Sequence, residues 1–187
     1  MTLFYSIRAF FLLTLPWLNP FAPGPSPPVV PWLVAMTAAG GLLWLAALRG
    51  VGGKPLDESP LTIRWSGFLA WALVVAGLAS SLIGLLQYFG IAAALEPWIR
   101  QGAYGEAFAN LRQRNQFASL TNMALVALVW LSMLARNNLP ESPPATSTNP
   151  LPQPALLLAA ALLAAGNVAS SSRTGLMQLL FLCGLFW

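Results

Sequence analysis

Four long stretches of the 187-residue chain contain no charged side chain: residues 9–48, 65–95, 115–135 and 142–172. Each is long enough to supply the roughly 20 apolar residues that a helix needs to cross a bilayer. Backbone polar groups must pair within the protein in lipid, and the strict alternation of a barrel strand is absent. The pattern therefore predicts an all-α, polytopic helical membrane protein with about five to six transmembrane helices.

Proline and polar residues divide these stretches into separate helices. Residues 19–28 are rich in proline, and residues 49–64 form a polar connection. Residues 137–154 combine six prolines with Ser, Thr and Asn, and we expect them to form a flexible linker. The predicted helices cover residues 3–18, 29–48, 66–89, 117–135, 155–168 and 174–187.

Two features of the helices carry further expectations. In the third helix, Gly77 with Ser81 and Ser80 with Gly84 have the small-xxx-small spacing that lets helices approach closely. The last apolar run, residues 174–187, would span only about 21 Å of a hydrocarbon core roughly 30 Å thick. We therefore expect the sequence to stop inside a helix and to be the N-terminal transmembrane region of a longer multi-span protein.

Composition narrows the function classes. The chain is 57% hydrophobic and 7% charged, with a mean hydropathy of +0.68, which excludes an ordinary soluble domain. Its nine basic residues form no basic stripe, so no nucleic acid is expected as a partner. The sequence has no histidine and no carboxylate cluster, so neither a metal nor a cofactor is expected. The single cysteine, Cys183, lies in an apolar run and is expected to be buried and inert.

The polar run at residues 110–116 is where chemistry is expected. It places two arginines and four amides at the mouth of an apolar helix: Asn110, Arg112, Gln113, Arg114, Asn115 and Gln116. Cations in this position cost free energy unless they meet an anion. In a helix, Arg112, Asn115 and Ser119 share one face with Asn122, so a polar stripe descends into the bilayer. With Asn110 as the expected N-cap, the helix start and its arginines predict a clamp for phosphate or pyrophosphate.

An alternative interpretation of this run is structural. Arg112 and Arg114 could extend to lipid headgroups or pair with Glu96 and Glu106, while the amides hold helices together. The concentration of two arginines and four amides within seven residues favours the functional interpretation.

A second helix start carries a similar pattern. Ser170, Ser171 and Ser172 offer hydroxyl caps ahead of Arg173. If the N-terminus is cytoplasmic, this start lies on the outer side with the 110–116 run. The outer cations are then all arginines, which suits pairing with phosphate. Gln87, near the end of the third helix, reaches the same side and is a candidate for substrate contact or for an interhelical hydrogen bond.

The segment from Asn110 to Leu120 resembles the signature of bacterial protein O-oligosaccharyltransferases. These are the pilin-glycosylating ligases of the O-antigen ligase and polymerase superfamily. The stretches Leu85–Gly90 and Ser170–Gly175 are also similar to parts of such proteins, and the resemblance runs from about residue 80 to 187.

The resemblance implies a multi-pass glycosyltransferase of the bacterial inner membrane that is active on the periplasmic side. It would take an undecaprenyl-pyrophosphate-linked oligosaccharide as donor and a Ser or Thr hydroxyl of a pilin-like protein as acceptor, among membrane lipids. Arg112, Arg114 and Arg173 would contact the pyrophosphate as catalytic residues. The substrate site would be lined by Gln113, Asn115 and Gln116, with Asn110, Ser119 and Gln87 as further candidates.

This chain departs from the family in one respect. Such enzymes carry a large periplasmic loop with a histidine that activates the acceptor, and no histidine is present here. We therefore expect this region alone to bind donor without catalysing transfer.

Other functions stay open at this stage. Within the same superfamily, ligation to lipopolysaccharide and polymerisation of O-antigen are close alternatives, and the Arg-Gln-Arg-Asn-Gln run favours the protein-modifying branch. A transporter or flippase for an anionic lipid would also use arginines, although no internal repeat supports it. A structural membrane subunit or a truncated, inactive product is a third possibility.

Overall fold

The computed structural model describes residues 3–18, 29–50, 58–96, 98–111, 113–137 and 153–185. Within these ranges the chain forms α-helices and one short 3-10 helix, and no strand. The elements are α1 (Leu3–Leu18), α2 (Val29–Gly50), α3 (Glu58–Tyr88), η1 (Ile91–Leu95), α4 (Arg114–Asn137), α5 (Gln153–Ala169) and α6 (Arg173–Leu185). The all-helical fold class predicted from the hydrophobic pattern is confirmed.

Four helices start earlier than the hydrophobic pattern predicts, α5 and α6 by one or two residues and α3 and α4 by more. α3 begins at Glu58 rather than at residue 66, and Pro60 lies in its first turn, where a missing N–H group is tolerated. α4 begins at Arg114 rather than at residue 117. In both cases polar residues continue the helix beyond its apolar part, because hydropathy marks the apolar part and not the helix end. Of the predicted linker, residues 138–152 lie outside the described residues.

Two helical segments among the described residues are long and apolar enough to cross a membrane. They are Ser66–Tyr88 in α3 and Arg114–Ala135 in α4. Ile7–Leu18, Leu33–Leu45 and Gln153–Ala169 are apolar but shorter. These lengths are consistent with a membrane protein, while the larger number of spans stays a prediction.

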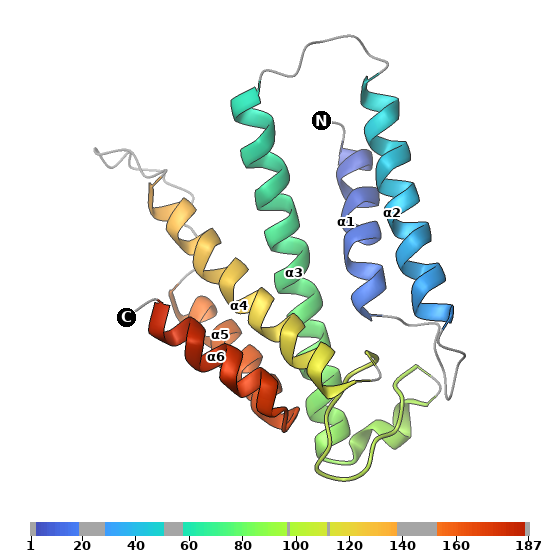
Figure 1. Cartoon of the computed structure of the whole chain (residues 1–187), viewed down its shortest axis with the longest axis vertical. Helices are drawn as coiled ribbons and strands as arrows, with labels where there is room; N and C mark the ends of the chain where they lie inside the picture. The colour runs from blue at the N-terminus through green and yellow to red at the C-terminus, as the bar shows by residue number, and fades with distance from the viewer. Residues whose placement is uncertain are drawn as a thin grey trace.

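The long helix α3 organises the arrangement (Figure 1). It contacts α1 on one side, and α1 contacts α2; on the other side α3 contacts α4 and α5, and α6 lies against α4. The end of α3, the start of α4, the end of α5 and the start of α6 all lie at the lower end in Figure 1. Arg114 and Arg173, the first residues of α4 and α6, are therefore brought to the same end of the protein.

The core between α3, α4 and α5 depends on small residues. Its buried members are Ala70, Val74, Ala124, Ala127, Leu128 and Leu163. A Cβ atom added at Gly77 would overlap the Cβ of Ala124, and one added at Gly166 would lie 2.8 Å from Cβ and 3.1 Å from Cα of Ser81. The close approach predicted for the small residues of α3 is confirmed, with α4 and α5 as the partners.

Replacement of Gly166 by Ala should loosen the contact between α3 and α5. The added methyl group meets the backbone of Ser81, so the helices must separate, at a cost of about 1–3 kcal/mol. The midpoint of thermal unfolding in detergent should fall. Gly40→Ala is the matched control, because a Cβ atom at Gly40 in α2 has no atom within 4 Å among the described residues. Equal midpoints for the two variants would contradict this account of the packing.

Candidate functional site

A buried glutamine at the end of α3 holds the loop between α3 and α4. Gln87 is 1% exposed. Its Nε2 donates to the backbone carbonyls of Arg100 and Ala109, both at 2.8 Å, and its Oε1 accepts from the backbone N–H of Phe108 at 3.1 Å. Because both amide protons are used inside the protein, this placement favours a structural role over the substrate contact considered from the sequence.

Asn110 ties the same loop to α1. Its Nδ2 donates to the carbonyls of Leu18 and Trp98, both at 3.2 Å, and its Oδ1 accepts from the backbone N–H of Arg100 at 3.4 Å. The prediction that Asn110 is the N-cap of the helix is wrong, because α4 begins at Arg114 and the Asn110 amide bonds to the loop and to α1. Asn110 and Gln87 thus fix the loop that leads into α4.

The start of α6 is capped by a serine side chain. Ser172 Oγ accepts the backbone N–H of Gly175 at 3.0 Å, which is the N-cap hydrogen bond expected for a hydroxyl just before a helix. In the preceding turn, Ser170 Oγ accepts from the backbone N–H of Ser172 at 3.2 Å and donates to the carbonyl of Asn167 at 2.5 Å. The capping role predicted for these serines is confirmed at Ser172.

The first turns of α4 and α6 are joined directly. Ser172 Oγ donates to Asn115 Oδ1 at 2.8 Å. Arg114 and Arg173 are the chain neighbours of these two residues, and each opens its helix. The backbone N–H groups of a first helical turn lack intrahelical partners and carry a partial positive charge. Two such helix starts with an arginine each therefore favour an anion at this end of the protein.

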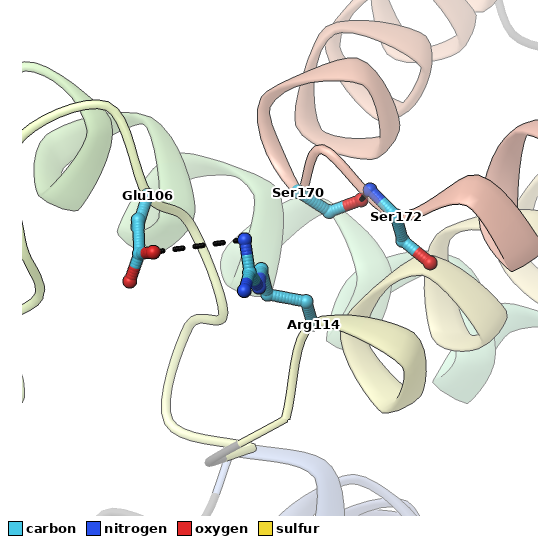
Figure 2. Close-up of polar contacts among 4 residues, drawn as sticks. All are labelled: Glu106, Arg114, Ser170 and Ser172. Atoms are coloured by element: carbon cyan, nitrogen blue, oxygen red, sulfur yellow. Dashed lines mark hydrogen bonds and ion pairs between the residues drawn. The ribbon is translucent and has the colours of Figure 1, made fainter.

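Arg114 has a weak partner in the loop. Its Nη1 lies 3.6 Å from Glu106 Oε1, and the two side chains are 50% and 41% exposed. Figure 2 shows the Arg114 side chain between Glu106 and the turn that carries Ser170 and Ser172. An exposed ion pair contributes about 0–1 kcal/mol, so a phosphate group can replace the Glu106 carboxylate at low cost. The pairing with Glu106, which was the structural alternative, is compatible with anion binding.

The remaining residues of the predicted site surround this pair of helix starts. Arg173 is exposed and makes no ion pair with any residue that the structure describes. Gln113, Asn115 and Gln116 are also exposed. Ser119 is half-buried one turn further along α4, and its Oγ donates to Gln178 Oε1 at 3.4 Å. Arg112 lies outside the described residues.

Further into the protein from the helix starts, buried amides connect α4, α5 and α6. Asn122 Nδ2 donates to the carbonyl of Gly175 and to Gln178 Oε1, both at 3.1 Å. Asn167 Nδ2 donates to Thr121 Oγ1 and Asn122 Oδ1, both at 2.9 Å. Reasoning from the sequence did not single out Asn167. The available signal was a lone amide in the Ala- and Leu-rich helix α5, since polar residues inside apolar helices need partners.

An apolar groove of about 620 Å³ begins at this network and lies between α3, α4 and α6. On α4 and α6, the lining residues nearest to the helix starts are polar: Ser119, Asn122 and Gln178. A further polar lining residue, Ser66, lies on α3. The rest of its lining is Leu69, Ala70, Leu73, Met123, Val126, Ala127, Trp130, Phe181 and Leu182. The groove therefore extends from the cationic end along the apolar part of the helices.

Metal-ligating and thiol groups do not contribute to this arrangement. Within the described part of the chain, no three His, Cys, Asp or Glu residues lie close enough to hold a metal ion. The expectation that Cys183 is buried is wrong, because the residue lies on an exposed face of α6.

Comparison with known proteins supports the resemblance over a limited segment. A family model described as "Protein glycosylation ligase" matches residues 107–131. The match covers the end of the α3–α4 loop, Arg114 and most of α4. No curated protein and no solved structure matches the chain. The matched segment carries Arg114, and the match suggests a role as a protein glycosylation ligase. It identifies neither the donor, nor the acceptor, nor the membrane face.

Replacement of Gln87 by Leu should release the loop without changing the helices. The variant removes three hydrogen bonds and leaves the N–H of Phe108 and two carbonyls unpaired, each at a cost of about 1–3 kcal/mol. Hydrogen exchange at Phe108 should therefore become much faster. Gln101→Leu is the control, because Gln101 makes one exposed side-chain hydrogen bond, to Glu96. Unchanged protection of Phe108 in Gln87→Leu would refute the anchoring role.

Proposed function

We propose that this chain is the N-terminal transmembrane region of a longer ligase. The enzyme transfers a glycan from an undecaprenyl-pyrophosphate-linked donor to a Ser or Thr hydroxyl of a pilin-like protein, at the periplasmic face of the bacterial inner membrane. The observation that carries the proposal is the contact between two helix starts that each open with an arginine. The family match over residues 107–131 supports the reaction class.

The proposed chemistry needs cations at the leaving group. In the transfer, the acceptor oxygen forms a bond to the anomeric carbon while the bond between that carbon and the pyrophosphate oxygen breaks. Negative charge grows on the departing lipid pyrophosphate, and positioned guanidinium groups lower the barrier by stabilising it. Arg114 and Arg173, with Arg112, take this role. The exposed amides of Gln113, Asn115 and Gln116 supply further hydrogen bonds to the donor.

We assign activation of the acceptor hydroxyl to another part of the enzyme. The hydroxyl of the acceptor loses its proton, and a histidine is the usual base near neutral pH. The sequence contains no histidine. By resemblance, the activating histidine belongs to a further periplasmic loop, so the present region binds the donor and stabilises its leaving group.

The apolar groove supports a lipid-linked donor over a water-soluble sugar nucleotide. The groove begins near Ser119 and Gln178, close to the cationic helix starts, and is otherwise lined by apolar side chains except for Ser66. A polyprenyl chain in the groove would place its pyrophosphate at Arg114 and Arg173. A soluble donor would gain nothing from an apolar surface of this length.

Replacement of Arg114 or Arg173 by Ala in the complete protein should lower glycan transfer about hundredfold, because each variant removes a cation from the leaving-group oxygens. Protein level and membrane insertion should be unchanged, since both side chains are exposed. Intact-protein mass spectrometry of the acceptor measures the glycosylated fraction. Arg8→Ala is the matched control, since Arg8 is an exposed cation in the first half of α1. If both variants transfer glycan at the wild-type rate, the assigned pyrophosphate site is wrong.

A further inference from the structure

The helix that carries Arg173 has little apolar attachment to the rest of the protein. Among residues 173–184 of α6, Gly175 alone is buried. The large apolar side chains of the helix are mostly exposed: Leu176, Met177, Leu180 and Phe181 range from 51% to 70%. Apolar burial therefore does little to fix the register of α6 on α4, and other contacts must do so.

Hydrogen bonds from α4 provide those contacts. Asn122, which is 4% exposed, donates both of its amide protons to α6, one to the carbonyl of Gly175 and one to Gln178 Oε1. The absence of a side chain at Gly175 allows this approach, because a Cβ atom there would overlap the Cβ of Ala118. A backbone carbonyl two residues beyond Arg173 is thus held by a buried side chain of α4.

Asn122 is itself held in place by α5. Asn167, which is 3% exposed, donates to Asn122 Oδ1 at 2.9 Å and also to the carbonyl of Ala118 at 3.2 Å. Its contact with Thr121 Oγ1 fixes the same turn of α4. The orientation of the Asn122 amide is therefore determined, with its oxygen toward α5 and its nitrogen toward α6.

We propose that Asn122, oriented by Asn167, is a positioning residue that holds the first turn of α6 against α4 and so keeps Arg173 beside Arg114. Amide hydrogen bonds fix one register, because a shift of α6 by one residue leaves buried donors without acceptors, whereas apolar surfaces can slide. Asn122 also lines one end of the apolar groove, but both of its amide protons are used by α6, so it acts on Arg173 through that helix. The part of the proposal that concerns catalysis rests on the proposed function of Arg173.

A cross-linking experiment tests the docking of α6 without reference to activity. Asn115→Cys and Ser172→Cys, at the hydrogen-bonded pair, are introduced in full-length protein in which Cys183 is replaced by Ser. These changes remove the Ser172–Asn115 hydrogen bond, so that before oxidation the hydrogen bonds from Asn122 hold α6 against α4. Mild oxidation should form the disulfide rapidly. Asn122→Leu should slow its formation about fivefold or more, because the first turn of α6 then samples other positions. Gln178→Leu, which removes one of the two Asn122 acceptors on an exposed side chain, should slow it less.

The control variant is Ser132→Ala, which removes a hydroxyl from α4 that bonds to Val129 within the same helix. It should leave the cross-linking rate unchanged. A rate in Asn122→Leu equal to that of the control, with the variant inserted at the normal level, overturns the proposal. If Asn122→Leu does not fold, Gln178→Leu provides the test. An unchanged cross-linking rate in Gln178→Leu also overturns the proposal.

A double-mutant cycle tests the catalytic consequence. In the complete enzyme, Asn122→Leu should lower glycan transfer about tenfold when Arg173 is present and less than about twofold in Arg173→Ala, because the positioned group is then missing. Equal losses in both backgrounds would mean a general structural effect and would overturn the positioning role. If Arg173→Ala alone has no effect, the proposed function of Arg173 fails, while the cross-linking rate still decides whether Asn122 docks α6.

Discussion

Two hydrogen bonds, from Ser172 to Asn115 and from Asn122 to the carbonyl of Gly175, join the starts of α4 and α6, and the arrangement of the two arginines depends on them. Ser172 also caps α6 through the N–H of Gly175. One hydroxyl thus ends the tight turn after α5, starts α6 and attaches that start to α4. The consequence is electrostatic, because the positive ends of two helices, each opening with an arginine, are joined at the same end of the protein.

Buried amides of α3, of the α3–α4 loop and of α4 and α5 hold the surrounding elements in place. Asn122 and Asn167 fix α6 and α5 to α4, and Gln87 and Asn110 fix the loop that leads into α4. Polar side chains among apolar helices are costly unless they are paired, and here their pairing determines where the exposed cations lie. The same small set of residues therefore serves both the fold and the proposed site.

Much of this arrangement could be predicted from the sequence. Charge-free stretches located the helices, and the polar run at residues 110–116 indicated the end where cations gather. The helix starts were less accessible, because Glu58 and Arg114 extend their helices with polar residues that hydropathy does not count. Serine before an arginine and an apolar run was sufficient to predict the cap of α6.

The roles of individual amides could not be separated from the sequence. Gln87 and Asn110 are amide residues of the kind that contact ligands, yet their partners are backbone groups that lie 10 to 92 residues away along the chain. Asn167 is marked in the sequence as a lone amide in an apolar helix, but its partners belong to another helix and have no local signal. Partners of this kind are set by tertiary contacts, so only the packed structure separates amides that bind the protein from amides that are free for a substrate.

Photo-cross-linking with a polyprenyl-pyrophosphate analogue tests the central claim most directly. An analogue with a photoreactive group beside the pyrophosphate is bound to the complete protein in membranes, and the labelled peptides are identified by mass spectrometry. The account predicts labels within one or two residues of both Arg114 and Arg173, because it places the pyrophosphate at the two joined helix starts. Labels confined to other parts of the protein, with both helix starts unmodified, would contradict it.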